Sequence, residues 1–93
     1  METLSLRTTA REQLLDVTEE LQELVARKGW TDGALVLFCP HTTGAVTGNE
    51  AADPDVARDI AVNMGTIVPR RGDYRHAEGN SDAHIKTSLF GPS

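Results

Sequence analysis

The longest uninterrupted apolar run in the chain, Ala34 to Cys39, places the strongest constraint on the fold. A run of this length without alternation is typical of a strand and predicts one that is buried on both faces. Asp32-Gly33 is a turn signal ahead of the run, and Pro40 interrupts ladder hydrogen bonding at its end. The rest of the sequence must therefore supply cover for both sides of this segment.

Two other segments have strand-like patterns. Residues 3–7 alternate, with both leucines on one face, and residues 43–47 are rich in small and β-branched side chains. Because only about three strands are indicated, the sheet would be thin. One face of the 34–39 strand would then lack a cover within this chain.

An amphipathic helix is predicted between the first two of these segments. Thr9 stands three residues before Glu12, which is the capping-box spacing that marks a helix start. Lys28 suits the C-terminal end, and Gly29 is placed for a left-handed cap. The apolar stripe of this helix has a period near 3.6 residues and consists of Leu14, Val17, Leu21, Leu24 and Val25.

Two further helices are predicted. Asp53 as N-cap and Pro54 as first helical residue indicate the start of one, and Pro69 indicates its end. Ser81 is expected to cap a short final helix over residues 82–90.

Residues 70–80 have no periodicity, and we expect a loop there. Strands and helices in this order predict a single small α+β domain over residues 1–93.

The composition argues against several classes of protein. No apolar run approaches the ~20 residues that a membrane span requires, and the start of the chain lacks the basic and apolar regions of a signal peptide. The net charge of −5 argues against general nucleic-acid binding, because phosphate neutralisation needs a basic face. A single cysteine permits no internal disulfide, so we expect a cytoplasmic location.

Candidate functional residues are concentrated in the segment from Tyr74 to Lys86. It holds two of the three histidines, together with carboxylates, an amide, a hydroxyl and cations. Imidazoles titrate near neutral pH, carboxylates can orient them, and cations attract an anionic substrate. A segment this polar offers little to a core, and we expect it to bind a metal or a phosphate.

The three histidines, His41, His76 and His84, supply the number of ligands that a catalytic zinc site uses. Their spacing forms no compact ligand motif, so surface or hydrogen-bonded histidines are the alternative. Carboxylates that could accept the remaining imidazole N–H groups are Glu50, Glu78 and Asp82.

The cations Arg75 and Lys86 flank the histidines. Arg75 could hold a phosphate through two hydrogen bonds, and Ser81 with the amides of a helix start would add an anion-binding end. Arg70 and Arg71 are better explained as a solvated basic loop. An acidic protein with this basic edge could bind a phosphorylated small molecule.

Asn49 and Glu50 lie at a junction between a strand and a helix, where sites often gather. Glu50 is a candidate general base, with a solvated turn residue as the alternative. For Asp82, a place in the first turn of a helix is the alternative to catalysis. Cys39 is expected to be a buried core thiol.

Four stretches of the chain form a characteristic set: Cys39-Pro40-His41-Thr42-Thr43-Gly44-Ala45-Val46-Thr47-Gly48-Asn49-Glu50, Ala52-Asp53-Pro54-Asp55-Val56, Tyr74-Arg75-His76-Ala77-Glu78-Gly79-Asn80-Ser81-Asp82-Ala83-His84-Ile85-Lys86 and Leu89-Phe90-Gly91-Pro92-Ser93. Together they resemble the YjbQ-type family, whose members are described as secondary thiamine-phosphate synthases. The resemblance implies an α+β domain with a mainly antiparallel sheet packed by helices, and a homotrimer. It also implies a site around the histidines that binds a divalent metal, with zinc expected, or an anion.

The implied activity couples hydroxymethylpyrimidine diphosphate to a thiazole phosphate as a weak, accessory reaction. The resemblance implies metal ligands at His41, His76 and His84, and Asn49, Glu50, Asn80 and Asp82 also fall on characteristic polar positions of the family. We expect catalytic groups at Glu50 and Asp82. The expected substrate-binding residues are Asn49, Arg75, Asn80, Ser81 and Lys86. A non-catalytic module that binds a phosphometabolite or a metal is the alternative, and an oligomerisation protein without a small ligand is a third.

One departure from the family is notable. Its members continue past Gly91-Pro92-Ser93 through strands with a Gly-Thr-Trp-Gln-like motif, whereas the only tryptophan here, Trp30, does not match that position. We therefore expect the C-terminal strands to be absent from this chain, and these are the strands that would cover the sheet.

Overall fold

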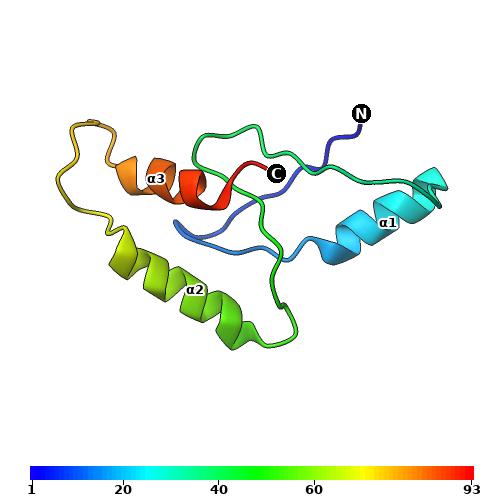
Figure 1. Ribbon diagram of the computed structural model, residues 1–93, viewed down its shortest axis with the longest axis horizontal. Helices are drawn as coiled ribbons and strands as arrows, with labels where there is room; N and C mark the ends of the chain where they lie inside the picture. Colours follow the sequence, from blue (N-terminus) through cyan, green and yellow to red (C-terminus); the bar gives the residue numbers. More distant parts are fainter. The chain divides into compact units, whose positions relative to one another are not determined.

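The computed structural model describes residues 1–93 and contains three helices: α1 (Thr18–Lys28), α2 (Pro54–Ile67) and α3 (Ser81–Phe90) (Figure 1). The chain divides into two compact units, Met1–Thr31 and Asp32–Ser93. The first unit holds α1, and the second holds α2 and α3. None of the three helices is both long enough and apolar enough to cross a membrane.

The expected mainly antiparallel sheet is absent, so the prediction of an α+β fold is wrong for this structure. The segments 3–7, 34–39 and 43–47 contain no strand. A strand requires a neighbouring backbone that satisfies its N–H and C=O groups in register, and local sequence cannot supply that neighbour. The three segments have strand-like composition without forming a ladder.

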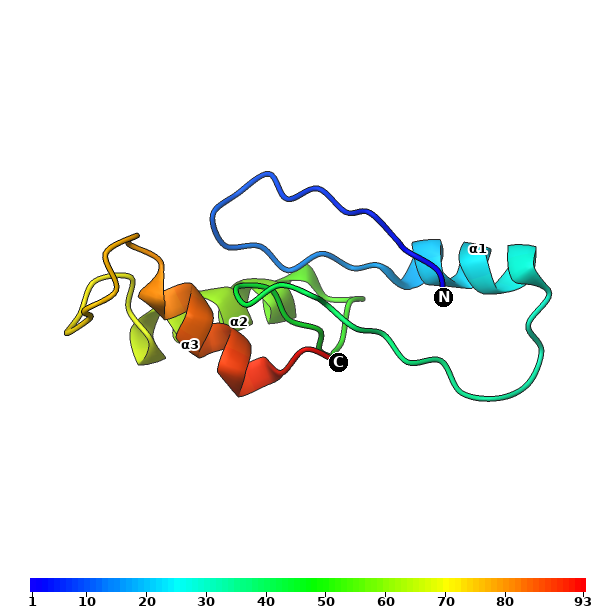
Figure 2. The same cartoon turned by 90° about the horizontal axis from the view of Figure 1, so that it is seen from above.

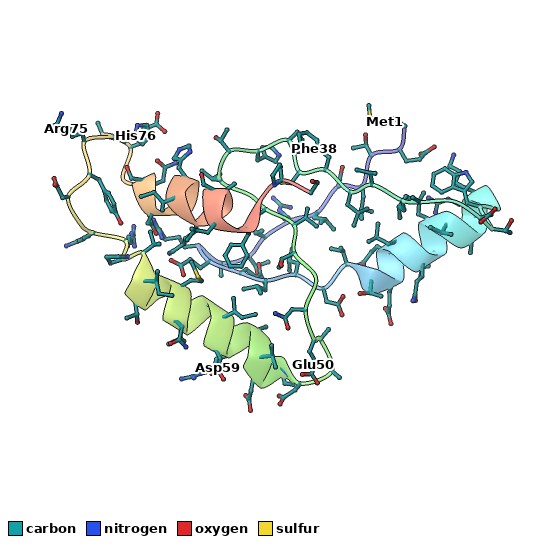
Figure 3. All side chains as sticks on the ribbon, in the orientation of Figure 1. Met1, Phe38, Glu50, Asp59, Arg75 and His76 are labelled. Atoms are coloured by element: carbon teal, nitrogen blue, oxygen red, sulfur yellow. The ribbon has the colours of Figure 1, made fainter.

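The apolar run at 34–39 is exposed rather than buried on both faces. Leu35, Val36 and Phe38 have relative exposures of 48%, 79% and 66%. Phe38 is labelled in Figure 3. Cys39, expected in a core, is half-buried and free. The prediction that this segment is buried on both faces is therefore wrong.

Two backbone hydrogen bonds connect the end of this run and the turn after it with the two residues that follow α3. The N–H of Cys39 donates to the carbonyl of Pro92 at 2.8 Å, and the N–H of Val46 donates to the carbonyl of Gly91 at 3.1 Å. They hold the 39–46 turn region beside the end of α3 without making a sheet.

α1 begins at Thr18, later than the capping box at Thr9 predicts. The backbone N–H of Thr9 donates to the side chain of Gln13 at 2.9 Å, so the predicted box with Glu12 does not form. The helix instead starts beside Asp16, whose carboxylate accepts from the Thr18 hydroxyl at 2.6 Å and from the Thr18 N–H at 3.0 Å. These bonds, the hydroxyl first, hold the pKa of the Asp16 carboxyl below its ordinary value.

The C-terminal end of α1 confirms the prediction of a left-handed glycine cap. Gly29 has φ of 68°, and its N–H donates to Ala26 at 3.1 Å. The N–H of Trp30 donates to the carbonyl of Val25 at 3.2 Å, which completes a Schellman motif. Glycine suits this position because other residues adopt a positive φ only with strain.

The bounds of α2 agree with the prediction. The Asp53 side chain accepts from the N–H of Asp55 at 2.9 Å, and Pro54 is the first helical residue. The helix ends before Pro69, and Val68 between them is the one buried apolar side chain, with 7% exposure.

α3 begins one residue earlier than predicted. Ser81 is its first residue, Asn80 holds the N-cap position without a side-chain cap bond, and Gly91 ends it with φ of 93°. The expected loop at 70–80 has no helix or strand and joins the end of α2 to the start of α3 (Figure 2). This loop and the first turns of α3 carry most of the candidate functional residues.

Candidate functional site

The loop after α2 is fastened by Tyr74. Its hydroxyl donates to the carbonyl of Pro69 at 2.5 Å, and its backbone N–H donates to the carbonyl of Gly72 at 2.9 Å. The two bonds return the chain toward the end of α2. Arg75 and His76 follow directly, so the loop presents them beside the start of α3.

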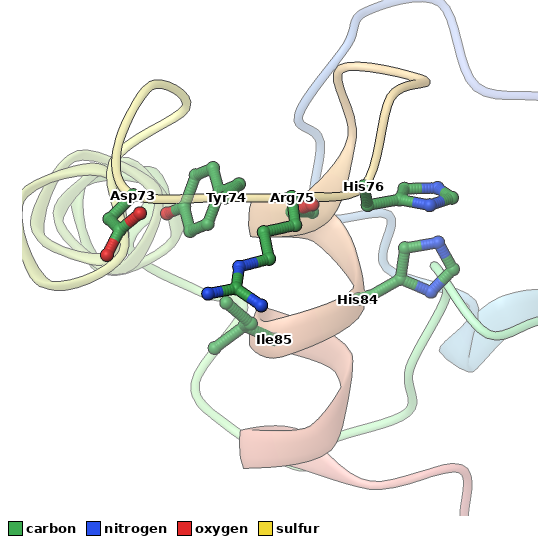
Figure 4. Close-up of a pocket in the computed structure, with 7 residues that line it drawn as sticks. Asp73, Tyr74, Arg75, His76, His84 and Ile85 are labelled. Atoms are coloured by element: carbon green, nitrogen blue, oxygen red, sulfur yellow. The ribbon is translucent and has the colours of Figure 1, made fainter.

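A pocket of about 440 Å³ lies between this loop and α3 (Figure 4). α3 contributes Ser81, His84 and Ile85, whose i, i+3, i+4 spacing puts them on one helix face. The loop contributes Asp73, Tyr74, Arg75 and His76. Four residues predicted from the sequence therefore meet at one site: Arg75, His76, Ser81 and His84.

The two imidazoles of the pocket contact each other edge to face. The ring centroids of His76 and His84 are 5.4 Å apart with an interplanar angle of 88°. Nε2 of His76 also lies 3.7 Å from a carboxylate oxygen of Glu78, which is an exposed and weak ion pair even when the imidazole is protonated. Figure 4 shows the Arg75 side chain extending toward Ile85.

Asp82 and Lys86 form an ion pair that is not part of the pocket lining. Nζ of Lys86 is 3.1 Å from Oδ2 of Asp82, and the two side chains are 13% and 0% exposed. The Asp82 carboxylate is fully buried, and neither residue lines the pocket. The structure therefore joins the expected catalytic Asp82 and the expected substrate-binding Lys86 in an ion pair along α3.

Asn80 lies beside the pocket rather than on its lining. Its backbone carbonyl accepts from the N–H groups of Ala83 and His84 at 3.1 and 3.4 Å, which starts α3. Its side-chain Oδ1 is buried without a hydrogen-bond partner. An orphaned buried acceptor of this kind is uncommon and costs ~1–3 kcal/mol.

The remaining predicted residues lie on the segments before α2. Asn49 and Glu50 are exposed, and the Glu50 N–H donates to the Asn49 side chain at 2.8 Å. Glu50 precedes α2, whereas the pocket loop follows it (Figure 3). The 14 residues of α2 span roughly 21 Å, so the structure does not bring Glu50 to the pocket.

His41 is exposed, and its carbonyl accepts from the N–H of Gly44 at 3.4 Å in a turn. No group of three His, Cys, Asp or Glu side chains is arranged to hold a metal ion. Two imidazoles on one tetrahedral zinc would have ring centroids roughly 5 Å apart, given a Zn–N distance of ~2 Å. His76 and His84 fit that spacing, but the third ligand is missing, so the residues present do not make the expected three-histidine site.

Three pocket residues had no role in the sequence prediction: Asp73, Tyr74 and Ile85. Ile85 could have been found, because it stands on the same helix face as Ser81. Asp73 and Tyr74 adjoin Arg75 in the sequence. The hydrogen bond from Tyr74 to Pro69 has no sequence signal.

The comparisons with known proteins agree on one family. The family described as UPF0047 protein YjbQ-like matches residues 2–93. UPF0047 protein YugU of Bacillus subtilis is 40% identical over 94 residues, covering 100% of this chain and 71% of YugU. A UPF0047 protein of Methanocaldococcus jannaschii is 42% identical over 88 residues, covering 95% of this chain and 64% of that protein.

A solved structure is also similar. The crystal structure of an uncharacterized conserved protein of the YjbQ/UPF0047 family from Clostridium acetobutylicum has a TM-score of 0.90 and 52% identity, over 94% of this chain and 67% of that one. The chain thus spans about two thirds of the length of these relatives, with shares of 71%, 64% and 67%.

Proposed function

The chain belongs to the YjbQ-like UPF0047 family, and from that premise we propose that it is an enzyme of the secondary thiamine-phosphate synthase type. The observation that supports this proposal is the meeting of Arg75, His76, Ser81 and His84 in one pocket. A guanidinium, two imidazoles and a helix-start hydroxyl form a set suited to phosphate oxygens. We also propose that the protein is cytoplasmic and forms a homotrimer.

In the proposed reaction, the thiazole nitrogen attacks the methylene carbon of hydroxymethylpyrimidine diphosphate. A C–N bond forms, the C–O bond to the diphosphate breaks, and the diphosphate leaves with the electron pair. Arg75 stabilises the charge that accumulates on the departing oxygens through two N–H bonds. His76 and His84 each offer an N–H donor for the same oxygens, and Ser81 orients the phosphate at the start of α3.

The proposal includes a divalent metal, zinc, at this pocket. His76 and His84 would be two of its ligands, and the third would have to come from outside their pair. The reaction above is therefore assigned to side chains of the pocket alone. Elemental analysis of protein purified without chelators, followed by zinc titration, tests the metal separately from turnover.

The substitution Arg75→Lys tests the phosphate site. Lysine keeps the charge but loses the planar fork, so pyrophosphate binding should weaken by ~1–3 kcal/mol. Arg71→Lys is the matched control, because Arg71 is exposed in the same loop and does not line the pocket. Calorimetry with pyrophosphate gives the affinities. Equal binding by the original and Arg75→Lys proteins would remove Arg75 from the site.

A second candidate is a binding module without turnover. It is favoured by the placement of the expected catalytic carboxylates, because neither Glu50 nor Asp82 lines the pocket. In that case pyrophosphate binds, but mixtures of the two thiamine precursors yield no thiamine phosphate by mass spectrometry. Turnover that persists in Arg71→Lys and disappears in His84→Asn would instead support the enzyme.

A further inference from the structure

We propose that Tyr74 is a positioning residue that fixes Arg75 and His76 at the pocket. The inference rests on the proposed function, since it concerns how the same pocket holds an anionic ligand. Tyr74 closes the loop from Pro69 to Tyr74 into a small ring anchored at the end of α2. The next two residues of the chain are Arg75 and His76, which line the pocket.

The closure involves both the backbone and the side chain of Tyr74. The N–H donates to Gly72 at 2.9 Å, which turns the chain, and the hydroxyl donates to Pro69 at 2.5 Å, which fastens the turn. The aromatic ring lies against Gly72, because a Cβ built at that glycine would be 3.3 Å from the Cζ atom of Tyr74. A methyl group at position 72 would therefore crowd the ring.

The anchor point is held by a helix. The N–H of Val68 donates to the carbonyl of Met64 at 2.8 Å, and Val68 is buried, so the chain just before Pro69 is fixed. The loop beyond it has no regular structure. Without the Tyr74 hydroxyl, Arg75 and His76 would belong to a longer, freer loop and would lose conformational entropy when they bind a ligand.

Tyr74 also lines the pocket, together with Ile85 on the facing helix (Figure 4). Its hydroxyl donates to the carbonyl of Pro69, so Tyr74 contributes its aromatic ring to the pocket. Tyr74 is the single tyrosine of the chain. The whole near-UV absorption of tyrosine in this protein therefore comes from a residue of this pocket.

The test uses Tyr74→Phe in the full chain, which removes the hydroxyl and keeps the ring. We expect pyrophosphate binding to weaken about fivefold, equivalent to ~1 kcal/mol, the scale of one hydrogen bond. The NMR signals of the His76 ring should shift in the unliganded protein, whereas those of His41 should not. Ser88→Ala is the matched control, because its exposed hydroxyl also donates to a backbone carbonyl, that of His84 at 3.0 Å.

A second variant guards against a protein that does not fold. Gly72→Ala places a methyl group against the aromatic ring of Tyr74, and it should shift the same His76 signals. If the original protein binds pyrophosphate and both variants bind it equally well, with His76 signals unchanged, the positioning role is refuted. If the original protein does not bind pyrophosphate, the proposed function fails, while the His76 signals still decide the role of Tyr74.

Discussion

The buried ion pair of α3 offers a sharp test of what stabilises residues 32–93. Oδ2 of Asp82 and Nζ of Lys86 are 3.1 Å apart, and the side chains are 0% and 13% exposed. At an effective dielectric constant near 20, the Coulomb attraction at this distance is about 5 kcal/mol. The cost of removing both charges from water offsets much of it.

We expect Asp82→Asn to destabilise this unit by about 2–4 kcal/mol. Breaking a buried pair typically costs ~3–5 kcal/mol, because one charge stays buried without its counter-ion. Lys86 is partly exposed to water, so its charge, once separated from the Asp82 carboxylate, should cost less than that of a fully buried group. The variant also removes a negative charge from the first turn of α3, where it interacts favourably with the helix dipole by ~0.3–1 kcal/mol.

Urea unfolding, followed by far-UV circular dichroism and by the near-UV signal of Tyr74, gives the free energy of unfolding. Tyr74 reports on residues 32–93, whereas the single tryptophan, Trp30, lies in the other unit. A double-mutant cycle with Lys86→Met isolates the pair, and the double variant should be more stable than the two single losses predict. A loss below about 0.5 kcal/mol, or a coupling energy near zero, would refute the reasoning.

Two further predictions concern other parts of the chain. Gly44→Ala should cost ~1–3 kcal/mol in thermal or urea unfolding, because a Cβ there would lie 2.8 Å from Sγ of Cys39. Gly48→Ala is the matched control, because a Cβ at that position would have nothing within 4 Å. Equal stability of the two variants would contradict the prediction, because it would show that the turn at Gly44 accommodates a methyl group without strain. For α1, the pKa of Asp16 is lowered below its ordinary value of 3.8, so its contribution to helix stability is fully present above that value. The contribution is lost as the pH falls through the lowered folded-state pKa. Far-UV circular dichroism from pH 5 downward should show this loss, and Asp16→Asn should remove the part of the pH dependence that belongs to this carboxyl.

The helix ends show which parts of the fold could be predicted from the sequence. Asp53-Pro54 and Gly29 act on backbone groups a few residues away, so their effects are local and were predicted correctly. The helix start predicted at Thr9 is wrong because the Thr9 N–H donates to the side chain of Gln13. The helix starts instead beside the carboxylate of Asp16, which accepts from the Thr18 N–H. Capping signals identify possible starts, and competition between them decides which one is used.

The sheet could not be predicted in the same way. Whether residues 34–39 form a strand depends on a hydrogen-bonding neighbour that is distant in sequence, and composition carries no information about it. The residues that line the pocket could be grouped from the sequence because they lie in one short segment. Arg75, His76 and His84 meet across a single loop, whereas Glu50 and His41 depended on a tertiary arrangement that the structure does not contain.

The exposed run at 34–39 has a consequence for the colloidal behaviour of the chain. Six uncharged apolar residues without a strand partner have the composition of segments that stack into intermolecular cross-β contacts. Electrostatic repulsion from the net charge of −5 opposes such contacts between copies. The range of that repulsion shrinks from ~30 Å at 0.01 M salt to ~8 Å at 0.15 M. Concentrated samples of this chain should therefore become turbid on addition of salt, with Leu35, Val36 and Phe38 at the contacts.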